Sequence, residues 1–448
     1  MTGGFQEWVR LKPGVWSAED QQGRLHLFQR WGRCQALGAL SADDRALLRS
    51  LAEGPITVGP ELELLKTLRA GGWLEITISR HGDALYTLCP VSPPAVPEPV
   101  AGDLVLSRFA IMRREEAELL LESPLAWAGV RVHDPEVARI VAGLAGPVHE
   151  PLTPDDRLGH RVRHDLRVAG LAVPACGEEE TRRELRQWGP HELWFHERSR
   201  MRDRLPADRG WGRTSWGKAA FAPLPARHEG YGGAGVRLHR PDLAALRLTD
   251  PSLTAVIEDR RSARVFDDER PIDVRQLGEL LYRCARVRAG YLLDDQERVD
   301  RPYPSGGALH ELELYPVVRT VAGLEAGMYH YDPRAHRLNL VRSAGPEVNR
   351  LLAAAAWAAA TRERPQVLIV ISARFGRVMW SYSEMAYALV LKHVGVLQQT
   401  MYLVATAMGL GACALGGGDS SAFSAATGLD ELAEASVGEF MLGSGAAG

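Results

Sequence analysis

The sequence predicts an α+β protein whose two halves are built differently. The first 195 residues contain a helix-rich pattern that occurs twice, whereas long helices alternate with apolar strands from residue 246 onward. The stretch between these halves is rich in arginine, proline and glycine. Such a shift between two regular patterns is typical of a domain boundary. We therefore expect four parts: residues 1–97, residues 98–195, a linker at 196–245, and residues 246–448.

The repeated N-terminal pattern consists of a helix ending at Gly-Pro and a second helix that stops at glycine before a strand. Residues 46–55 read ALLRSLAEGP, and residues 138–147 read ARIVAGLAGP. The second helices are expected at 63–72 and 160–170. A period of roughly 90 residues is longer than that of solenoid repeats and therefore indicates two small domains.

Local signals place the elements of these two domains. Ser41 followed by Asp44 resembles a capping box, and Asp134 before Pro135 is typical of a helix start. The runs WLEITI and ALYTLC alternate with period two around RHGD, which predicts a hairpin. Strand, two helices and hairpin favour a winged-helix module, with a generic α+β packing domain as the alternative. Residues 60–70 lack the basic character of a DNA-reading helix, so we expect a peptide ligand at an edge strand.

Composition excludes several classes of protein. The chain has 448 residues and a net charge of -3, without the basic excess of a nucleic-acid binder. Its five cysteines are scattered, which argues against a disulfide framework or a zinc site and fits a reducing cytoplasm. The most apolar stretch, 385–410, carries Lys392 and His393 and is expected to be a buried helix instead of a membrane span. No metal site is expected, so redox chemistry would depend on an organic cofactor.

The C-terminal half contains the strongest secondary-structure signals. YPVVRTV (315–321) and PQVLIVISA (365–373) predict buried strands, and ALHELEL (308–314) looks helix-like. Residues 383–408 predict a long helix that is apolar on most of its surface. Such a helix needs burial on several sides, which an intertwined dimer would supply. The linker at 196–245 is expected to be solvated; the alternative is a basic lip over an active site.

Three segments of this half could carry chemistry. Residues 259–264 (DRRSAR) gather three arginines and a hydroxyl, which suit a phosphate and ring oxygens. Residues 301–308 (RPYPSGGA) combine stiff prolines with glycines that allow close approach of a flat ligand. Residues 409–414 (GLGACA) match the dinucleotide fingerprint only superficially, because they close a helix instead of following a strand. GYGGAG (230–235) fails the same test. Taken alone, each segment could also be an ordinary group of charged surface residues or an ordinary turn.

Taken together and in this order, the segments resemble the SagB-type azoline dehydrogenases, flavin enzymes of the nitroreductase superfamily. The resemblance rests on RRSARVFDDE, RPYPSGGALHELELYPVV, AMGLGACALGGGD and VGEFMLG. It covers 250–445 strongly and 1–195 only in architecture. It implies a nitroreductase-like FMN domain in a homodimer that oxidises thiazolines or oxazolines of a ribosomal peptide to thiazoles or oxazoles. An azoline-containing precursor peptide and a cyclodehydratase complex would be its partners.

The resemblance also implies roles for individual residues. Those that fall on the family's FMN contacts belong to an arginine segment, a loop typically supplied by the partner subunit, and a glycine loop near flavin N5. They are Arg260, Arg261, Ser262 and Arg264, then Pro304, Ser305 and Gly306, and finally Leu415, Gly416 and Gly417.

The chain departs from the family at two places. Azoline oxidases carry a Lys-Tyr pair ahead of the long helix, where this chain has Ser381 and Tyr382. A serine hydroxyl is not basic near neutral pH, and a tyrosine ionises at about pH 10. Tyr382 would therefore need a lowered pKa to act as a base, or would relay a proton. The C-terminus also lacks the basic phosphate ligands of many nitroreductases, which places more weight on Arg260 and its neighbours.

Three functions stay open at this level. The first is azoline oxidation, as the resemblance implies. The second is another flavin-dependent oxidation or reduction of a peptide, because the family lysine is missing. The third is a peptide-binding scaffold without activity.

Overall fold

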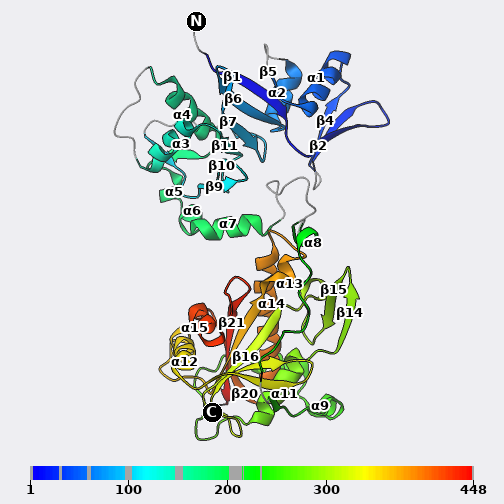
Figure 1. Ribbon diagram of the computed structural model, residues 1–448, viewed down its shortest axis with the longest axis vertical. Coiled ribbons are helices and arrows are strands. Elements are labelled where there is room, and N and C mark those ends of the chain that lie inside the picture. Colours follow the sequence, from blue (N-terminus) through cyan, green and yellow to red (C-terminus); the bar gives the residue numbers. More distant parts are fainter. Residues whose placement is uncertain are drawn as a thin grey trace. The chain divides into compact units, whose positions relative to one another are not determined.

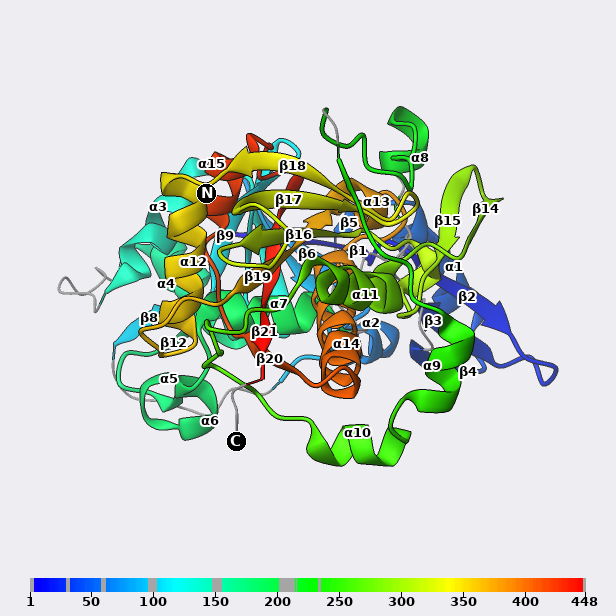
Figure 2. The ribbon, with the colours of Figure 1, turned by 90° about the horizontal axis from the view of Figure 1, so that it is seen from below.

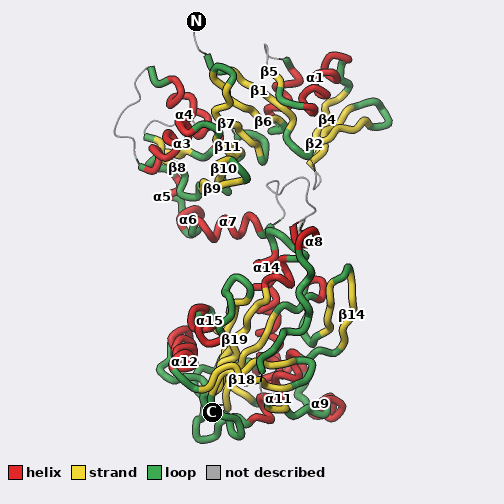
Figure 3. Tube along the Cα trace, viewed as in Figure 1, coloured by secondary structure: helices red, strands yellow, loops and turns green. Residues whose placement is uncertain are grey.

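The computed structural model describes residues 4–29, 33–57, 62–95, 103–146, 155–200, 214, 216–232 and 235–445. The chain divides into two compact units, Met1–Trp211 and Gly212–Gly448 (Figure 1). Both units mix helices with antiparallel strands, as the red and yellow segments of Figure 3 show. The predicted α+β class is confirmed.

The first unit is built on a seven-stranded antiparallel sheet of order β5-β1-β6-β7-β11-β10-β9. The sheet continues across the predicted boundary at residue 97, because Thr87 of β7 pairs with Arg131 of β11. Strands β2, β3 and β4 form a separate small sheet, and β8 pairs with β12. The strands are β1 Gln6–Leu11, β2 Val15–Glu19, β3 Leu25–Gln29, β4 Arg33–Gly38, β5 Ile56–Thr57, β6 Leu74–Arg80, β7 Asp83–Pro90, β8 Leu104–Leu106, β9 Ile111–Glu115, β10 Glu118–Glu122, β11 Ala128–Val132 and β12 Ala172–Pro174.

Two helix pairs pack on this sheet, each over its own apolar core. Ser41 accepts a hydrogen bond from the amide of Asp44, and Asp134 accepts one from the amide of Glu136, so both predicted caps are confirmed. The predicted hairpin is β6–β7. The helices are α1 Ala42–Glu53, α2 Glu63–Ala70, α3 Pro135–Ala142, η1 Gly143–Ala145, α4 Arg157–Ala169, α5 Glu178–Thr181, α6 Arg183–Arg186 and α7 Pro190–Arg198.

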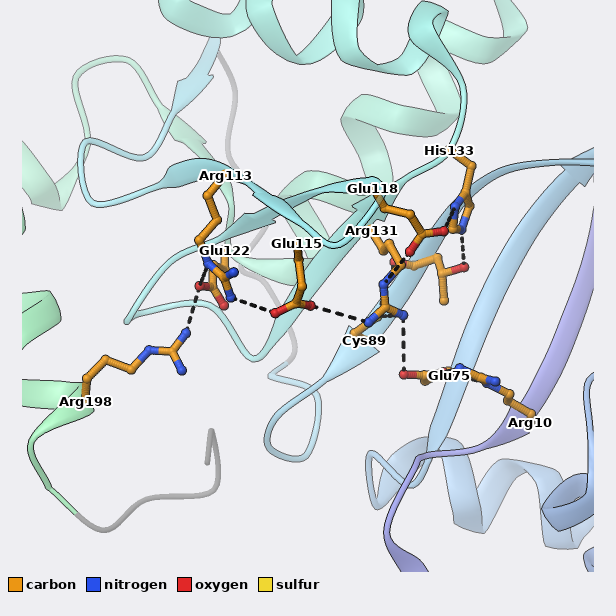
Figure 4. A network of polar contacts seen from close by, with 11 residues as sticks. Arg10, Glu75, Cys89, Arg113, Glu115, Glu118, Glu122, Arg131, His133 and Arg198 are labelled. Carbon is orange, nitrogen blue, oxygen red and sulfur yellow. Dashed lines mark hydrogen bonds and ion pairs between the residues drawn. The ribbon is translucent and has the colours of Figure 1, made fainter. Parts of the chain in front are cut away.

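A row of ion pairs crosses this sheet from β1 to β9 (Figure 4). Glu75 lies 2.5 Å from Arg10 and 3.9 Å from Arg131, so it links strands from both halves of the unit. Arg131 also lies 2.9 Å from Glu118. Because Glu75 is buried, its neighbouring guanidiniums offset the cost of removing the carboxylate from water.

The second unit contains a seven-stranded sheet of order β13-β18-β17-β16-β19-β21-β20, again antiparallel. Helices α11 and α14 belong to one face and α12 and α15 to the other (Figure 2). The helices are α8 Trp216–Ala220, α9 Leu243–Thr249, α10 Leu253–Asp259, α11 Val274–Ala285, η2 Gly306–Ala308, α12 Pro346–Ala358, α13 Phe375–Met379, α14 Ala386–Ala407 and α15 Ser420–Thr427. The strands are β13 Val236–Arg237, β14 Ala289–Leu293, β15 Gln296–Asp300, β16 Leu312–Val318, β17 Gly327–Asp332, β18 Arg337–Ser343, β19 Val367–Arg374, β20 Leu410–Leu415 and β21 Glu434–Ser444.

The helix-like interpretation of residues 308–314 is wrong, because this segment leads directly into strand β16. Glu313 and Tyr315 point toward one face of the sheet while Leu312 and Leu314 pack into the core of the other. Both faces are covered, so the strand is buried along its whole length and shows no simple alternation of polar and apolar residues.

Part of the predicted linker is built into the second unit. Strand β13 pairs with β18 at the edge of the sheet, and Ala226 is buried. The domain boundaries at 97, 195 and 245 stay a prediction.

Within the described ranges, no helix is long and apolar enough to cross a bilayer.

The hydrogen bond between Tyr86 and Asp165 tests whether the two N-terminal halves depend on each other. The hydroxyl of Tyr86, on β7, donates to the carboxylate of Asp165, on α4, at 2.6 Å. We expect Tyr86→Phe to lower the free energy of unfolding by about 1–2 kcal/mol, because a buried charge loses a donor. Urea denaturation measures this change. The matched control, Tyr291→Phe, removes an exposed hydroxyl, and an equal effect of both variants would contradict the coupling.

Candidate active site

Helix α14 supplies the framework of the candidate site. Its buried residues recur every three or four positions, at Val390, Val394, Leu397, Met401 and Ala405, and pack into the core of the sheet. This stripe fixes the rotation of the helix about its axis. As a result, His393 and Tyr402 also lie at defined positions, roughly 13 Å apart along the axis.

The arginine segment is attached to the C-terminal part of α14. The hydroxyl of Tyr402 lies 2.9 Å from Ser262 Oγ and accepts a hydrogen bond from the amide of Ala414 at 2.7 Å. The guanidinium of Arg260 lies 5.3 Å from the centre of the Tyr402 ring. Tyr402 therefore joins the arginine segment to strand β20, which leads into the glycine loop.

Two arginines of this segment are available for a ligand. The side chains of Arg261 and Arg264 are exposed, and neither forms a hydrogen bond or ion pair within the described part of the chain. Guanidinium groups in this state suit a phosphate, which they bind through paired, charge-assisted hydrogen bonds.

The proline-glycine loop is attached to the middle of α14. His393 Nε2 accepts a hydrogen bond from the amide of Gly306 at 2.8 Å, while Nδ1 lies 2.7 Å from Glu311 Oε1. The imidazole therefore carries its proton on Nδ1 and donates it to the carboxylate. Ser305 Oγ accepts a hydrogen bond from the amide of His310. Gly307 has a φ of +60°, a conformation that favours glycine.

The glycine loop lines a cavity of about 260 Å³ between β20, β21 and α14. A Cβ atom added at Gly416 or Gly417 would meet no atom within 4 Å, so the backbone faces open space. Gly418 differs, because a Cβ there would overlap the carboxyl group of Glu439. The loop can therefore admit a flat ligand at its first two glycines and is closed at the third.

The two predicted catalytic residues have different environments. Ser381 Oγ donates to Oε1 of the fully buried Gln296 at 2.7 Å, which makes its hydroxyl part of the packing. Tyr382 is partly buried, and its hydroxyl would lie 3.0 Å from a Cβ atom at Gly307. Of the pair, Tyr382 thus reaches the proline-glycine loop.

Glu439 is a candidate that sequence reasoning did not select. Its side chain is 7% exposed and lines the cavity of the glycine loop. Burial raises the pKa of Glu439 to about 7, although a hydrogen bond from Ser436 opposes this shift. A carboxyl group with a pKa near neutrality can both accept and release a proton. The available signal was a lone acid inside the apolar run VGEFMLG.

The structure brings all three predicted segments to α14 but does not gather them around one cavity. The cavity of residues 301–305 is also lined by Arg288 and Tyr291, and it shares no lining residue with the cavity of the glycine loop. In a single chain, the proline-glycine loop and the glycine loop, both predicted to contact FMN, therefore line two separate cavities.

Family models match two regions of the chain. The model described as cyanobactin oxidase ThcOx matches residues 104–204, and the nitroreductase family model matches residues 257–444. The first region lies in the N-terminal unit, and the second contains all three predicted segments.

Curated relatives agree with these matches. A putative nitroreductase of Methanocaldococcus jannaschii, MJ1384, is 33% identical over 184 residues, which cover 41% of this chain and 85% of the relative. The trifolitoxin-processing protein TfxB of Rhizobium leguminosarum bv. trifolii is 33% identical over 29% of this chain and 36% of its own. The microcin B17-processing protein McbC of Escherichia coli is 27% identical over 32% of this chain and 52% of its own.

Solved structures include similar chains. A putative nitroreductase from Ralstonia eutropha has 24% identity and a TM-score of 0.39, covering 50% of this chain and 96% of its own. A chain of the Escherichia coli microcin synthetase McbBCD complex with truncated pro-MccB17 bound has 21% identity and a TM-score of 0.35. It covers 51% of this chain and 90% of its own.

The raised pKa of Glu439 predicts a pH-dependent stability. The unfolded chain ionises this group near its ordinary value of 4.5, whereas the folded chain does so at about 7. The unfolded state therefore binds fewer protons between these values, and the folded protein loses stability as the pH rises through this window. We expect Glu439→Gln to remove this loss, raising the free energy of unfolding at pH 8 by up to about 3 kcal/mol and changing it little at pH 4.5.

Thermal denaturation of the wild type and the variant at both pH values measures this difference. Glu431→Gln is the matched control, because Glu431 is exposed. A gain for Glu439→Gln that is the same at pH 4.5 and pH 8 would show that Glu439 titrates normally.

Proposed function

Because the chain belongs to the nitroreductase family, we propose that it is an FMN-dependent oxidoreductase that oxidises thiazoline or oxazoline rings of a ribosomally made peptide to thiazoles or oxazoles. One observation carries this proposal: the three segments expected to contact FMN all attach to α14, through Tyr402, His393 and the cavity beside Val394. The similarity to the trifolitoxin-processing protein TfxB and the microcin B17-processing protein McbC supports the choice of a peptide substrate.

The described residues fit FMN. Arg260, Arg261, Ser262 and Arg264 would hold its phosphate and ring oxygens, since the exposed guanidiniums of Arg261 and Arg264 have no other partner among the described residues. Leu415, Gly416 and Gly417 would face the ring edge, where the backbone borders open space. Pro304, Ser305 and Gly306 would pack against the ring face. When bound, FMN supplies the hydride acceptor for the oxidation.

A second copy of the chain would complete the site. The proline-glycine loop and the glycine loop line separate cavities, so a homodimer in which each chain lends its loop to the other would unite them. Exposed apolar side chains support such an interface. Leu253 and Ile257 on α10 are 67% and 50% exposed, and Tyr387 and Leu391 on α14 are 41% and 39% exposed.

Ring oxidation also requires removal of a proton, and the family lysine is replaced by Ser381. We assign proton acceptance to the carboxylate of Glu439 and proton relay to Tyr382. Ser381 would act by positioning, because its hydrogen bond to Gln296 fixes the start of the segment that carries Tyr382. With a pKa of about 7, Glu439 is largely ionised at pH 8 and can then accept the proton.

The N-terminal unit would hold the precursor peptide. Strand β9 lies at the end of the sheet order, so one of its edges pairs with no other strand among the described residues and could accept an added strand. Ile111 and Met112 on β9 are 36% and 39% exposed, which offers apolar contacts beside this edge. A cyclodehydratase complex in the cytoplasm would deliver the azoline peptide.

The activity is tested with a synthetic peptide that contains one thiazoline, the FMN-loaded protein and air. We expect a mass loss of 2 Da per ring, because aromatisation removes one hydride and one proton. Mass spectrometry reads the result. A flavin-loaded protein that leaves both thiazoline and oxazoline peptides unchanged would contradict azoline oxidation. A mass gain that depends on NAD(P)H would establish the alternative, a reduction of the peptide.

The proton assignment predicts distinct variant kinetics. We expect Glu439→Gln to lower kcat by about 100-fold or more without loss of flavin, because the site loses its proton acceptor. Tyr382→Phe should also lower kcat. Tyr282→Phe serves as the control, because Tyr282 on α11 lines none of the cavities described above. Steady-state rates from pH 5.5 to 9 measure both effects. A wild-type rate that does not rise near pH 7, together with full activity of Glu439→Gln, would rule out this carboxyl group.

The phosphate assignment predicts weaker flavin binding in arginine variants. Arg261→Gln and Arg264→Gln should each raise the Kd for FMN by about 10-fold or more, because each removes a charged hydrogen-bond donor. Arg275→Gln is the matched control, since Arg275 is exposed on α11 outside these segments. Fluorescence titration with FMN gives the Kd of the wild type and of each variant. If all four Kd values are equal, Arg261 and Arg264 do not bind the FMN phosphate.

A further inference from the structure

A third cavity in the C-terminal unit lies outside the residues assigned to FMN, and it shares Arg301 with the cavity of residues 301–305. It has a volume of about 190 Å³ and is lined by residues 226–232, by strands β16, β17 and β18, and by Arg301. Residues 226–232 include the start of the GYGGAG run and belong to the Arg-, Pro- and Gly-rich stretch that the sequence marks as a linker. None of the residues assigned to FMN lines this cavity.

Buried polar atoms of this wall have no hydrogen-bond partner within the described residues. They are Arg301 Nε, Glu313 Oε1, His330 Nδ1 and Arg337 Nε. Glu313 and His330 are each 2% exposed, and Arg301 is 5% exposed. Leaving such atoms without partners costs about 1–3 kcal/mol each, which favours a polar occupant that supplies the missing hydrogen bonds.

Positive charge exceeds negative charge at the wall. Arg227, Arg301, Arg334 and Arg337 line the cavity together with Glu229, Glu313 and Asp332. The two buried acids already have cationic partners: Glu313 lies 3.2 Å from His330 and 3.6 Å from Arg374, and Asp332 lies 3.3 Å from Arg227. Glu229 is exposed. Within the described part of the chain, Arg301, Arg334 and Arg337 form no ion pair with an acid. An anionic group would meet these three guanidiniums.

The unpartnered atoms also restrict the kind of anion. His330 Nε2 donates to Glu313 Oε2, because the ionised carboxylate can only accept. Burial raises the pKa of Glu313, but the hydrogen bond from His330, the charge of His330 and the nearby arginines lower it to about 2, so Glu313 Oε1 is an acceptor. The wall thus presents this carboxylate oxygen as an acceptor beside its guanidinium donors. A fully ionised carboxylate or sulfate offers no proton to this acceptor, whereas a hydrogenphosphate or a singly protonated phosphate monoester does.

We propose that this cavity is a phosphate-binding site, in which Arg301 and Arg337 hold the phosphoryl oxygens and Glu313 accepts the hydrogen bond of a P–OH group. Residues 226–232 close over the ligand and hold His228 against the sheet, 3.3 Å from Glu434. The phosphate comes either from free hydrogenphosphate or from the end of a larger phosphate monoester.

Isothermal titration calorimetry of the FMN-loaded protein tests this site. Bound FMN occupies the flavin phosphate site, so added phosphate cannot bind there. Inorganic phosphate should bind saturably and at least 10-fold more tightly than sulfate or acetate. Arg337→Gln and Arg301→Gln should each weaken phosphate binding by 10-fold or more, and Arg275→Gln should leave it unchanged. Glu313→Gln should lower the ratio of phosphate affinity to sulfate affinity. Circular dichroism shows whether each variant is folded. If Arg301→Gln does not fold, Arg337→Gln alone tests the arginine contacts.

The remaining arms identify the source of the phosphate and the outcomes that overturn the site. Glycerol phosphate that binds more tightly than inorganic phosphate indicates a larger monoester, and equal or weaker binding indicates free phosphate. The site is excluded if no oxyanion binds saturably, if sulfate binds as tightly as phosphate, or if Arg261→Gln removes binding while Arg337→Gln does not.

Discussion

The burial of helix α14 is the constraint on which the candidate site depends. The helix is apolar along Val390, Val394, Leu397 and Met401, and the sheet must cover this stripe. Once the stripe is fixed, His393 lies beneath the proline-glycine loop and Tyr402 beneath the arginine segment. Packing and ligand contacts are therefore not independent: a rotation of the helix would separate both loops from their anchors.

Polar groups in the second unit are buried at a cost, and the structure offsets that cost in different ways. His393 and Glu311 satisfy each other, so they serve to hold a loop. Burial raises the pKa of Glu439 to about 7, and no cation among the described residues forms an ion pair with it. Beside the third cavity, His330 and Arg374 keep Glu313 ionised, while its Oε1 atom accepts no hydrogen bond among the described residues. A buried charge that is fully paired supports structure, whereas one that lacks a partner is available for chemistry or for a ligand.

The sequence allowed much of the fold to be predicted, because local signals were strong where they agreed with packing. The caps at Ser41 and Asp134 and the helix around residues 383–408 are confirmed, and the family resemblance is confirmed by the matching cyanobactin oxidase and nitroreductase models. The continuous N-terminal sheet was not predictable, since pairing of β7 with β11 is a long-range contact without a local signal. Glu439 and the cavity beside His330 were missed because burial is a property of the folded chain. The lone acid in VGEFMLG was a signal for Glu439, but it does not reveal that the side chain is buried.

The flavin content of the purified full-length protein tests the central claim most directly. Absorbance and protein concentration together give the number of FMN molecules per chain, and light scattering of the same sample gives the number of chains. If α14 organises the three segments into a flavin site completed by a second copy, one FMN per chain in a dimer is expected. A protein that is colourless as purified and binds no added FMN would contradict this account.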